Sequence, residues 1–185
     1  MREAAHTLTL GGVIAFPTET FYGLGAAALD AAAVDRLLAL KGRPAGKPVL
    51  VLVDSVAMAE TVAEVGPAAR ALMERHWPGA LTLVMPARAC LPPGITAGTA
   101  TVGVRMSPHA VARGLVTALG APVTAPSANP AGAEAPVTVA EVLRHFDGGI
   151  DLVLDGGATP GGPPSTVLDV TVDPPRVLRA GVVRL

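Results

Sequence analysis

The stretch VIAFPTETFYGLG, residues 13–25, places an apolar run directly before a polar segment rich in threonine and glycine. The apolar residues Val13 to Phe16 are typical of a strand buried on both faces. Pro17 and the residues after it are expected to end this strand in a loop. Ligands of α/β domains bind beyond the carboxyl ends of such strands. The stretch therefore predicts a layered α/β fold with a site beside the polar loop.

The rest of the chain alternates short apolar runs, helical patterns and Gly/Pro punctuation. Asp30 is a candidate N-cap, and Gly42 a candidate C-cap, of a helix that ends at Lys41. Further helices are expected at about 55–64, 67–76, 108–119 and 138–146. Strands are expected at about 13–16, 49–53, 80–85, 101–105, 123–125, 152–155, 165–170 and 175–179. We therefore predict a mixed sheet in a single domain, residues 1–185.

Composition restricts the classes of function. The 185 residues are 50% hydrophobic, enough for a sizeable core, with a formal charge of -1 and 3% aromatic residues. Without a basic field or many stacking rings, a dedicated nucleic-acid binder is disfavoured, and any RNA contact is expected to be local. No window reaches the roughly 18 apolar residues of a membrane span, and Cys90, the only cysteine, cannot form an intrachain disulfide. A cytoplasmic enzyme or binding domain is the expectation.

Polar residues that could form one site follow several of the expected strands. They are Thr18, Glu19, Arg105, Ser127, Asn129 and Asp155. Because the carboxyl ends of strands in open α/β sheets form a ligand crevice, we expect these residues to gather at one rim of the sheet. Each of them alone is also explained by its place in a loop, because loops are polar and Thr, Asn and Ser form turns, so the prediction rests on the group.

Two nucleotide-binding patterns are matched only in part. Gly23, Gly25 and Ala28 fit the G-x-G-x-x-A dinucleotide pattern, but Pro17 and the TET segment separate them from the strand that they should follow. GRPAGKP, residues 42–48, is one residue short of the Walker A spacing and has proline in place of the hydroxyl residue. The histidines are isolated, and no G-x-S-x-G elbow is present, so neither a zinc site nor a hydrolase triad is indicated.

Basic residues are the remaining candidates for binding an anionic ligand. Lys41 and Arg43 lie two residues apart at a predicted helix end, where they can grip a polyphosphate from two sides. The same cations can instead stabilise the C-terminal end of the helix dipole. On these residues alone, both interpretations stay open.

Seven segments occur in an order and spacing shared with one protein family. They are PTETFYGLG, KGRPAGKPV, RHWPGALTLV, TVGVRM, APSAN, PSTVLDV and RVLRAG. With them the chain resembles, over nearly its whole length, the YrdC-like threonylcarbamoyl-AMP synthase family, in its single-domain type. The most specific element is the K-x-R and S-x-N set, matched by Lys41, Arg43, Ser127 and Asn129. The resemblance implies an α/β fold with a twisted mixed β-sheet and flanking helices around a deep central cavity.

The resemblance also implies an activity and a set of site residues. The activity is that of a nucleotidyltransferase, which converts ATP, L-threonine and bicarbonate to threonylcarbamoyl-AMP and pyrophosphate for the threonylcarbamoyladenosine modification of tRNA. By motif match, Lys41 and Arg43 are catalytic. The nucleotide would contact Lys41, Arg43, Thr101, Ser127, Asn129 and Arg179, and threonine would contact Thr18, Tyr22, Arg105 and Ser165.

Cofactor and partners follow from the same resemblance. Mg²⁺ is expected to arrive with ATP, held by substrate oxygens and water, because the sequence shows no dense carboxylate cluster and thus no protein-held metal site. The product would pass to the tRNA threonylcarbamoyl-transferase machinery, and no membrane is involved. The alternative is a catalytically silent paralogue of the same fold that binds nucleotide or RNA.

Overall fold

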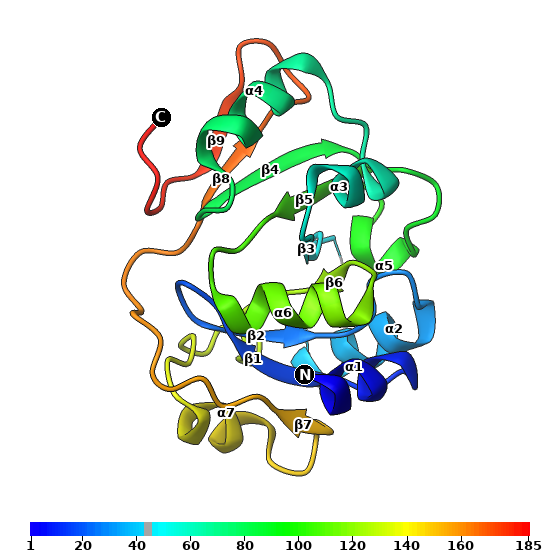
Figure 1. Ribbon diagram of the computed structural model, residues 1–185, viewed down its shortest axis with the longest axis vertical. Coiled ribbons are helices and arrows are strands. Elements are labelled where there is room, and N and C mark those ends of the chain that lie inside the picture. The colour runs from blue at the N-terminus through cyan, green and yellow to red at the C-terminus, as the bar shows by residue number, and fades with distance from the viewer. Residues whose placement is uncertain (43–45) are drawn as a thin grey trace.

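The computed structural model describes residues 1–42 and 46–185, whose strands form two mixed sheets (Figure 1). The smaller sheet has the order β2 (Tyr22–Gly25), β1 (Ile14–Pro17), β7 (Leu152–Val153). The larger sheet has the order β6 (Val123–Thr124), β3 (Leu50–Leu52), β5 (Thr101–Arg105), β4 (Leu81–Pro86), β8 (Thr166–Asp169), β9 (Arg176–Arg179). Each sheet contains parallel and antiparallel pairs. The predicted mixed α/β fold is confirmed, with the strands divided over two sheets.

The segment after β1 is the turn and second strand of a β-hairpin, so the prediction of a loop over all of it is wrong. The backbone N–H and the hydroxyl of Thr18 both donate to the carbonyl of Phe21, at 3.2 and 2.7 Å, which closes the turn. Glycine is a weak strand former, which is why β2 is hard to recognise from sequence. Packing requires Gly25, because a Cβ there would lie 2.9 Å from the Phe16 ring. Since Gly23 and Gly25 lie inside a strand that pairs with β1, the dinucleotide-binding turn is excluded.

Hydrogen bonds between the β2 region and β6 join the two sheets. The Leu24 N–H donates to the Pro126 carbonyl at 2.8 Å, and the Thr124 N–H donates to the Ala26 carbonyl at 3.0 Å. The Thr124 hydroxyl accepts from the Ala26 N–H at 2.8 Å. The hairpin is therefore fixed against one edge of the larger sheet.

The helices are α1 (Arg2–Thr9), α2 (Ala31–Lys41), α3 (Val56–Val62), α4 (Pro67–His76), α5 (Pro93–Thr96), α6 (Ala110–Leu119) and α7 (Val139–Phe146). α2 begins and ends as predicted: Asp30 Oδ1 accepts from two backbone N–H groups, and Gly42 has a left-handed φ of 58°. α1 and α5 were not predicted, because α1 has no side-chain cap and α5 has only 4 residues. Within the described ranges, no helix has the length and apolar character needed to cross a membrane.

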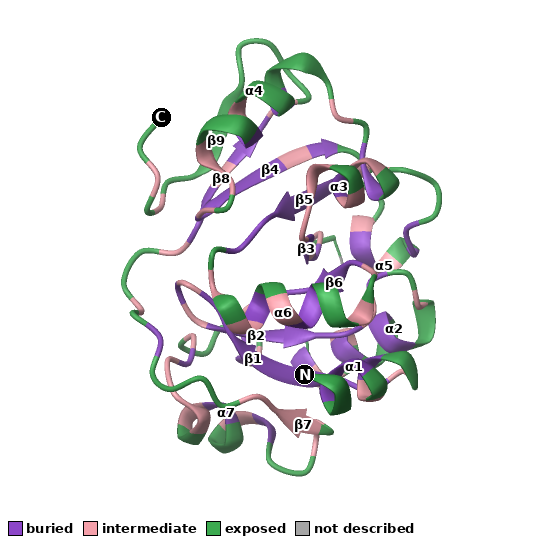
Figure 2. Cartoon of the chain, in the orientation of Figure 1, coloured by how far each residue is buried: buried purple, intermediate pink, exposed green. Residues whose placement is uncertain are grey.

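Alternating side chains divide β4 and β5 between two environments. Leu81, Leu83, Met85, Val102 and Val104 belong to a buried cluster that also contains side chains from α3, α4 and α5. The strands of both sheets are accordingly drawn mostly as buried in Figure 2, while the helices expose their outer faces. The intervening residues of β4 and β5 point to the opposite face of the larger sheet. That face borders the candidate site.

Candidate active site

A cavity of about 770 Å³ lies between the larger sheet and the β1–β2 hairpin. This volume is within the range of small-molecule sites in proteins. Its lining from the larger sheet and the residue before β8 is Leu50, Thr82, Val84, Thr101, Gly103, Arg105, Ser165, Val167, Asp169, Leu178 and Arg179. From the hairpin and the neighbouring loops it includes Thr18, Thr20, Phe21, Tyr22, Gly23, Pro48, Pro126, Ser127 and Asn129. The predicted site residues Thr18, Tyr22, Thr101, Arg105, Ser127, Asn129, Ser165 and Arg179 thus come together.

The cavity extends along the face of the larger sheet beyond the rim at which the sequence places the site. Of the six polar residues expected to gather there, Thr18, Arg105, Ser127 and Asn129 line it. Thr101, Gly103 and Arg105 alternate along β5 and line the cavity from the start of the strand to its end. Gly103 keeps this wall open, because a Cβ there would lie 3.3 Å from the Thr82 side chain. Asp155 does not join the lining, and its Oδ1 instead accepts from the Gly157 N–H at 2.9 Å.

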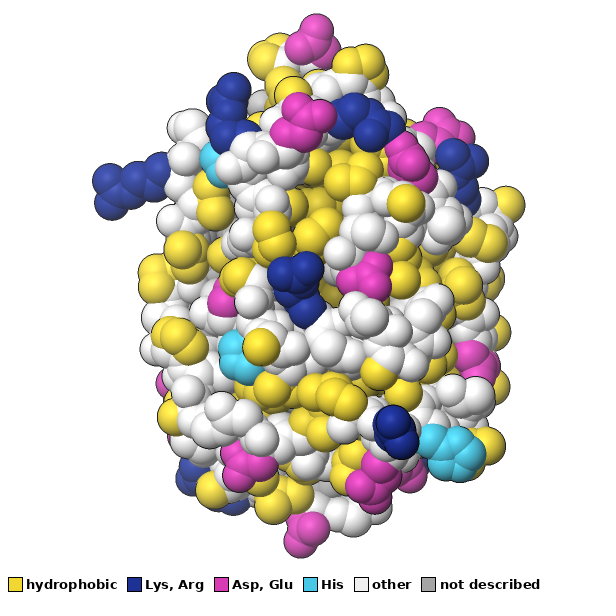
Figure 3. Space-filling model, viewed as in Figure 1, with side chains coloured by type: hydrophobic (Ala, Val, Ile, Leu, Met, Phe, Trp, Pro, Cys, Tyr) yellow, Lys and Arg dark blue, Asp and Glu magenta, His cyan; other side chains and the backbone are white. Residues whose placement is uncertain are grey.

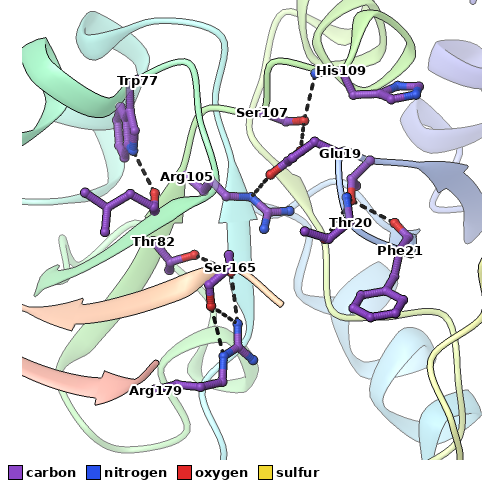
Figure 4. A network of polar contacts seen from close by, with 12 residues as sticks. Glu19, Thr20, Phe21, Trp77, Thr82, Arg105, Ser107, His109, Ser165 and Arg179 are labelled. Atoms are coloured by element: carbon purple, nitrogen blue, oxygen red, sulfur yellow. Dashed lines mark hydrogen bonds and ion pairs between the residues drawn. The ribbon is translucent and has the colours of Figure 1, made fainter. Parts of the chain in front are cut away.

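Arg105 is a buried cation with one carboxylate beside it (Figure 4). The residue is 3% exposed, and its Nε lies 3.4 Å from Oε1 of Glu19. Within the described ranges, no group accepts a hydrogen bond from its guanidinium. Burial lowers the pKa of Arg105, Glu19 raises it in turn, and Arg179 lowers it again. An arginine keeps its charge in proteins, so the cavity holds a desolvated cation suited to a carboxylate ligand.

Ser165 connects the residues that the sequence assigned to two different substrates. Arg179 Nη2 donates to the Ser165 carbonyl at 2.8 Å and to the Ser165 hydroxyl at 2.9 Å. The same hydroxyl lies 3.1 Å from the hydroxyl of Thr82, a cavity residue that was not predicted. Figure 4 shows Arg105 facing the space beside this group. The predicted nucleotide and threonine regions therefore adjoin at Ser165.

The hairpin residues Thr18 and Tyr22 are engaged in holding the cavity wall. Besides donating to Phe21, the Thr18 hydroxyl accepts from the Thr20 N–H at 3.2 Å. The Tyr22 hydroxyl donates to the Gly157 carbonyl at 2.8 Å, and burial raises its pKa, so the phenol stays neutral. Thr20 also lines the cavity and was not predicted.

The loop that carries Ser127 and Asn129, here called the S-x-N loop, presents one hydrogen-bond acceptor without a partner. Asn129 Nδ2 donates to the carbonyls of Pro130 and Ala133, at 2.9 and 2.7 Å, which fixes the orientation of the amide. Its Oδ1 is buried and has no hydrogen-bond partner. Because a buried acceptor without a partner is costly, this oxygen is suited to a donor group of a ligand.

Lys41 lies beneath this loop and is not among the residues that line the cavity. Its Nζ donates to the carbonyls of Ser127 and Asn129, both at 2.6 Å, and the residue is 5% exposed. The structure thus joins the two halves of the K-x-R and S-x-N set through Lys41. Arg43 lies outside the described residues.

Among the described residues, the other charged groups form no metal centre, and on the face seen in Figure 3 they form no broad basic surface. The described residues contain no group of three His, Cys, Asp or Glu side chains that could hold a metal ion. On the face seen in Figure 3, Lys and Arg side chains are separated from one another by acidic and uncharged residues.

Comparisons with known proteins identify relatives over nearly the whole chain. The family model Sua5_yciO_yrdC, described as "Telomere recombination", matches residues 6–181. The "Threonylcarbamoyl-AMP synthase" of Pyrococcus abyssi is 44% identical over 98% of this chain and 54% of its own length. That of Thiobacillus denitrificans is 41% identical over 94% of this chain and 91% of its own length. The crystal structure of P. abyssi Sua5 complexed with L-threonine has a TM-score of 0.94 and 45% identity, over 97% of this chain and 53% of that one. This chain thus spans about half the length of some relatives and most of others.

Proposed function

This chain belongs to the Sua5/YciO/YrdC family, and we propose that it forms threonylcarbamoyl-AMP and pyrophosphate from ATP, L-threonine and bicarbonate. It would then be a nucleotidyltransferase that acts in the cytoplasm. The product would pass to the machinery that modifies tRNA, and a weak direct tRNA contact stays a prediction.

One observation carries the proposal: a single cavity contains the desolvated guanidinium of Arg105 and, near it, a second arginine, Arg179, which is hydrogen-bonded to Ser165. Arg105 supplies donors for the α-carboxylate of threonine. Arg179 and the unpaired Oδ1 of Asn129 supply groups for the nucleotide. An amino acid and a nucleotide bound there would lie side by side, as their coupling requires.

The chemistry requires two bond-forming steps. The amine of threonine attacks the carbon of bicarbonate, and loss of water gives a carbamate. A carbamate oxygen then attacks the α-phosphorus of ATP, the bond from that phosphorus to the bridging oxygen breaks, and pyrophosphate leaves. Such phosphoryl chemistry depends mainly on positioning and on neutralising negative charge. Arg105, Arg179 and the hydroxyls of Thr82 and Ser165 would provide both in a cavity that is partly closed to water.

The cavity does not fit a protein-held metal ion. Within the described ranges, Asp169 is the one acidic residue of the lining. Its Oδ1 accepts from the Thr171 hydroxyl at 2.6 Å, and its Oδ2 pairs with Arg176 at 3.2 Å. We infer that Mg²⁺ enters with the phosphates of ATP and takes its ligands from them and from water.

The test is pyrophosphate release with each substrate omitted in turn, combined with mass spectrometry of the labile adenylate. We expect release only when ATP, threonine and bicarbonate are all present. Arg105→Ala should lose the pyrophosphate release that threonine supports. Arg70 lies in an exposed ion pair with Glu60, so Arg70→Ala should behave as wild type. Release that continues without threonine would overturn the proposal. ATP binding without any release would favour the silent paralogue.

A further inference from the structure

Glu19 contacts the binding site without being part of its surface. Thr18 and Thr20 line the cavity, but Glu19 between them does not. Its side chain is 15% exposed and is directed toward Arg105, with Oε1 3.4 Å from the guanidinium Nε (Figure 4). A carboxylate in this place contacts the substrate site only through Arg105.

Glu19 is itself held by a second contact. The Ser107 hydroxyl donates to Oε2 of Glu19, and the Ser107 oxygen accepts from the His109 N–H at 3.2 Å. His109 is the N-cap of α6, and Ser107 lies between β5 and that helix. The network therefore ties the turn of the β1–β2 hairpin to the end of β5, from which Arg105 extends.

The contact occupies one edge of the guanidinium. Because Glu19 faces Nε, the two terminal amino groups are left for a ligand, and no described residue accepts a hydrogen bond from them. A long arginine side chain has several rotatable bonds, and a bidentate carboxylate pair requires its planar fork in one orientation. A neighbouring negative charge that is itself anchored restricts the fork to that orientation.

We propose that Glu19 is a positioning residue that sets the orientation of Arg105 for binding the α-carboxylate of threonine. This inference rests on the proposed function for the identity of the ligand. For the strength of threonine binding, it predicts an effect opposite in sign to that of charge repulsion alone. If the charge of Glu19 acted only by repelling the substrate carboxylate, its removal would tighten threonine binding. If orientation dominates, its removal weakens binding.

Glu19→Gln is the informative variant, because glutamine has the same size and still accepts from Ser107. We expect the dissociation constant and the KM for threonine to rise about tenfold, with the KM for ATP changed by less than about twofold. Calorimetry with threonine and steady-state kinetics measure these values. Asp151→Asn is the matched control, since Asp151 pairs with Arg36 at 2.7 Å outside the cavity lining. This control should leave the threonine KM unchanged.

A double-mutant cycle separates positioning from a general structural role. In an Arg105→Ala background, Glu19→Gln should change threonine binding by less than about twofold, because the residue through which it acts is gone. An equal effect in both backgrounds, or tighter threonine binding in the single variant, would overturn the inference. If Glu19→Gln does not fold, Ser107→Ala keeps the charge but releases its anchor, and threonine binding should weaken about threefold. Unchanged threonine binding in Ser107→Ala would then overturn the inference.

The same measurements distinguish this inference from the proposed function. Wild-type protein that binds threonine but releases no pyrophosphate contradicts the reaction, while calorimetry still tests the positioning of Arg105. Wild-type protein that does not bind threonine contradicts both.

Discussion

Replacing Lys41 with methionine tests what holds the loop that carries Ser127 and Asn129. The Lys41 ammonium donates to both of their backbone carbonyls at 2.6 Å. Methionine keeps most of the aliphatic length of this buried side chain but removes the donors. The two carbonyl oxygens would each lose a partner, and the loop would move toward water to recover one.

The magnitude follows from the two bonds. A hydrogen bond to a charged group contributes about 1.5 to 3 kcal/mol, so the pair contributes about 3 to 6 kcal/mol before the cost of desolvating the ammonium. We expect Lys41→Met to lower the free energy of unfolding by about 3 kcal/mol. Because the loop also carries the unpaired Oδ1 of Asn129, we expect the dissociation constant for ATP to rise at least about tenfold.

Urea unfolding and calorimetry with ATP provide the two readouts. Arg70→Met is the control, since Arg70 pairs with Glu60 at the surface and its loss should cost less than about 1 kcal/mol. A Lys41→Met variant with wild-type stability and wild-type ATP affinity would refute the role of Lys41 beneath the loop. Wild-type stability with lost pyrophosphate release would instead assign the ammonium directly to the substrate.

Three further outcomes are expected. Arg105→Lys keeps the charge but loses the planar fork, so kinetics should show a threonine KM raised about tenfold to a hundredfold with a much smaller effect on ATP; equal loss for both substrates would contradict this. Gly103→Leu directs a side chain into the cavity beside Thr82, so calorimetry should show weaker binding of both ATP and threonine. Circular dichroism should show a folded chain, and normal binding of the two ligands would contradict the position of the cavity. The hydrogen bond from Arg36 lowers the pKa of Asp151 below 3.8, so Asp151 stabilises the fold above that pH and loses this effect as the pH falls through its folded-state pKa. Thermal unfolding of Asp151→Asn should therefore show a deficit of about 1 kcal/mol or less at pH 7 that shrinks as the pH is lowered below 3.8, and a deficit independent of pH would contradict it.

Much of the local structure could be predicted because it depends on neighbouring residues. Asp30 and Gly42 bound α2, since a capping carboxylate and a left-handed glycine act within one turn of the helix. Thr138 likewise begins α7 through a capping box with Glu141. The alternation along Thr101 to Arg105 predicts a strand, although not which of its faces meets a ligand.

Features that depend on distant contacts could not be predicted. β2 is a strand because β1 and the loop after β6 supply hydrogen-bond partners for a segment of weak strand propensity. Glu19 was noted in the sequence, but its partners Arg105 and Ser107 lie far along the chain. Thr82 is a cavity residue that the sequence could have indicated. It lies between the apolar Leu81 and Leu83, and this alternation places it on the opposite face of the strand.

The sequence by itself determined the α/β class, the helix boundaries set by caps, and the residue types that a site for anions requires. The tertiary structure decided where those residues act: Lys41 beneath the S-x-N loop, Ser165 between the two predicted binding regions, and Glu19 behind Arg105. The physical reason is the range of the interactions. Caps and periodicity act over a few residues, whereas the register of paired strands and the burial of charges depend on segments that only folding brings together.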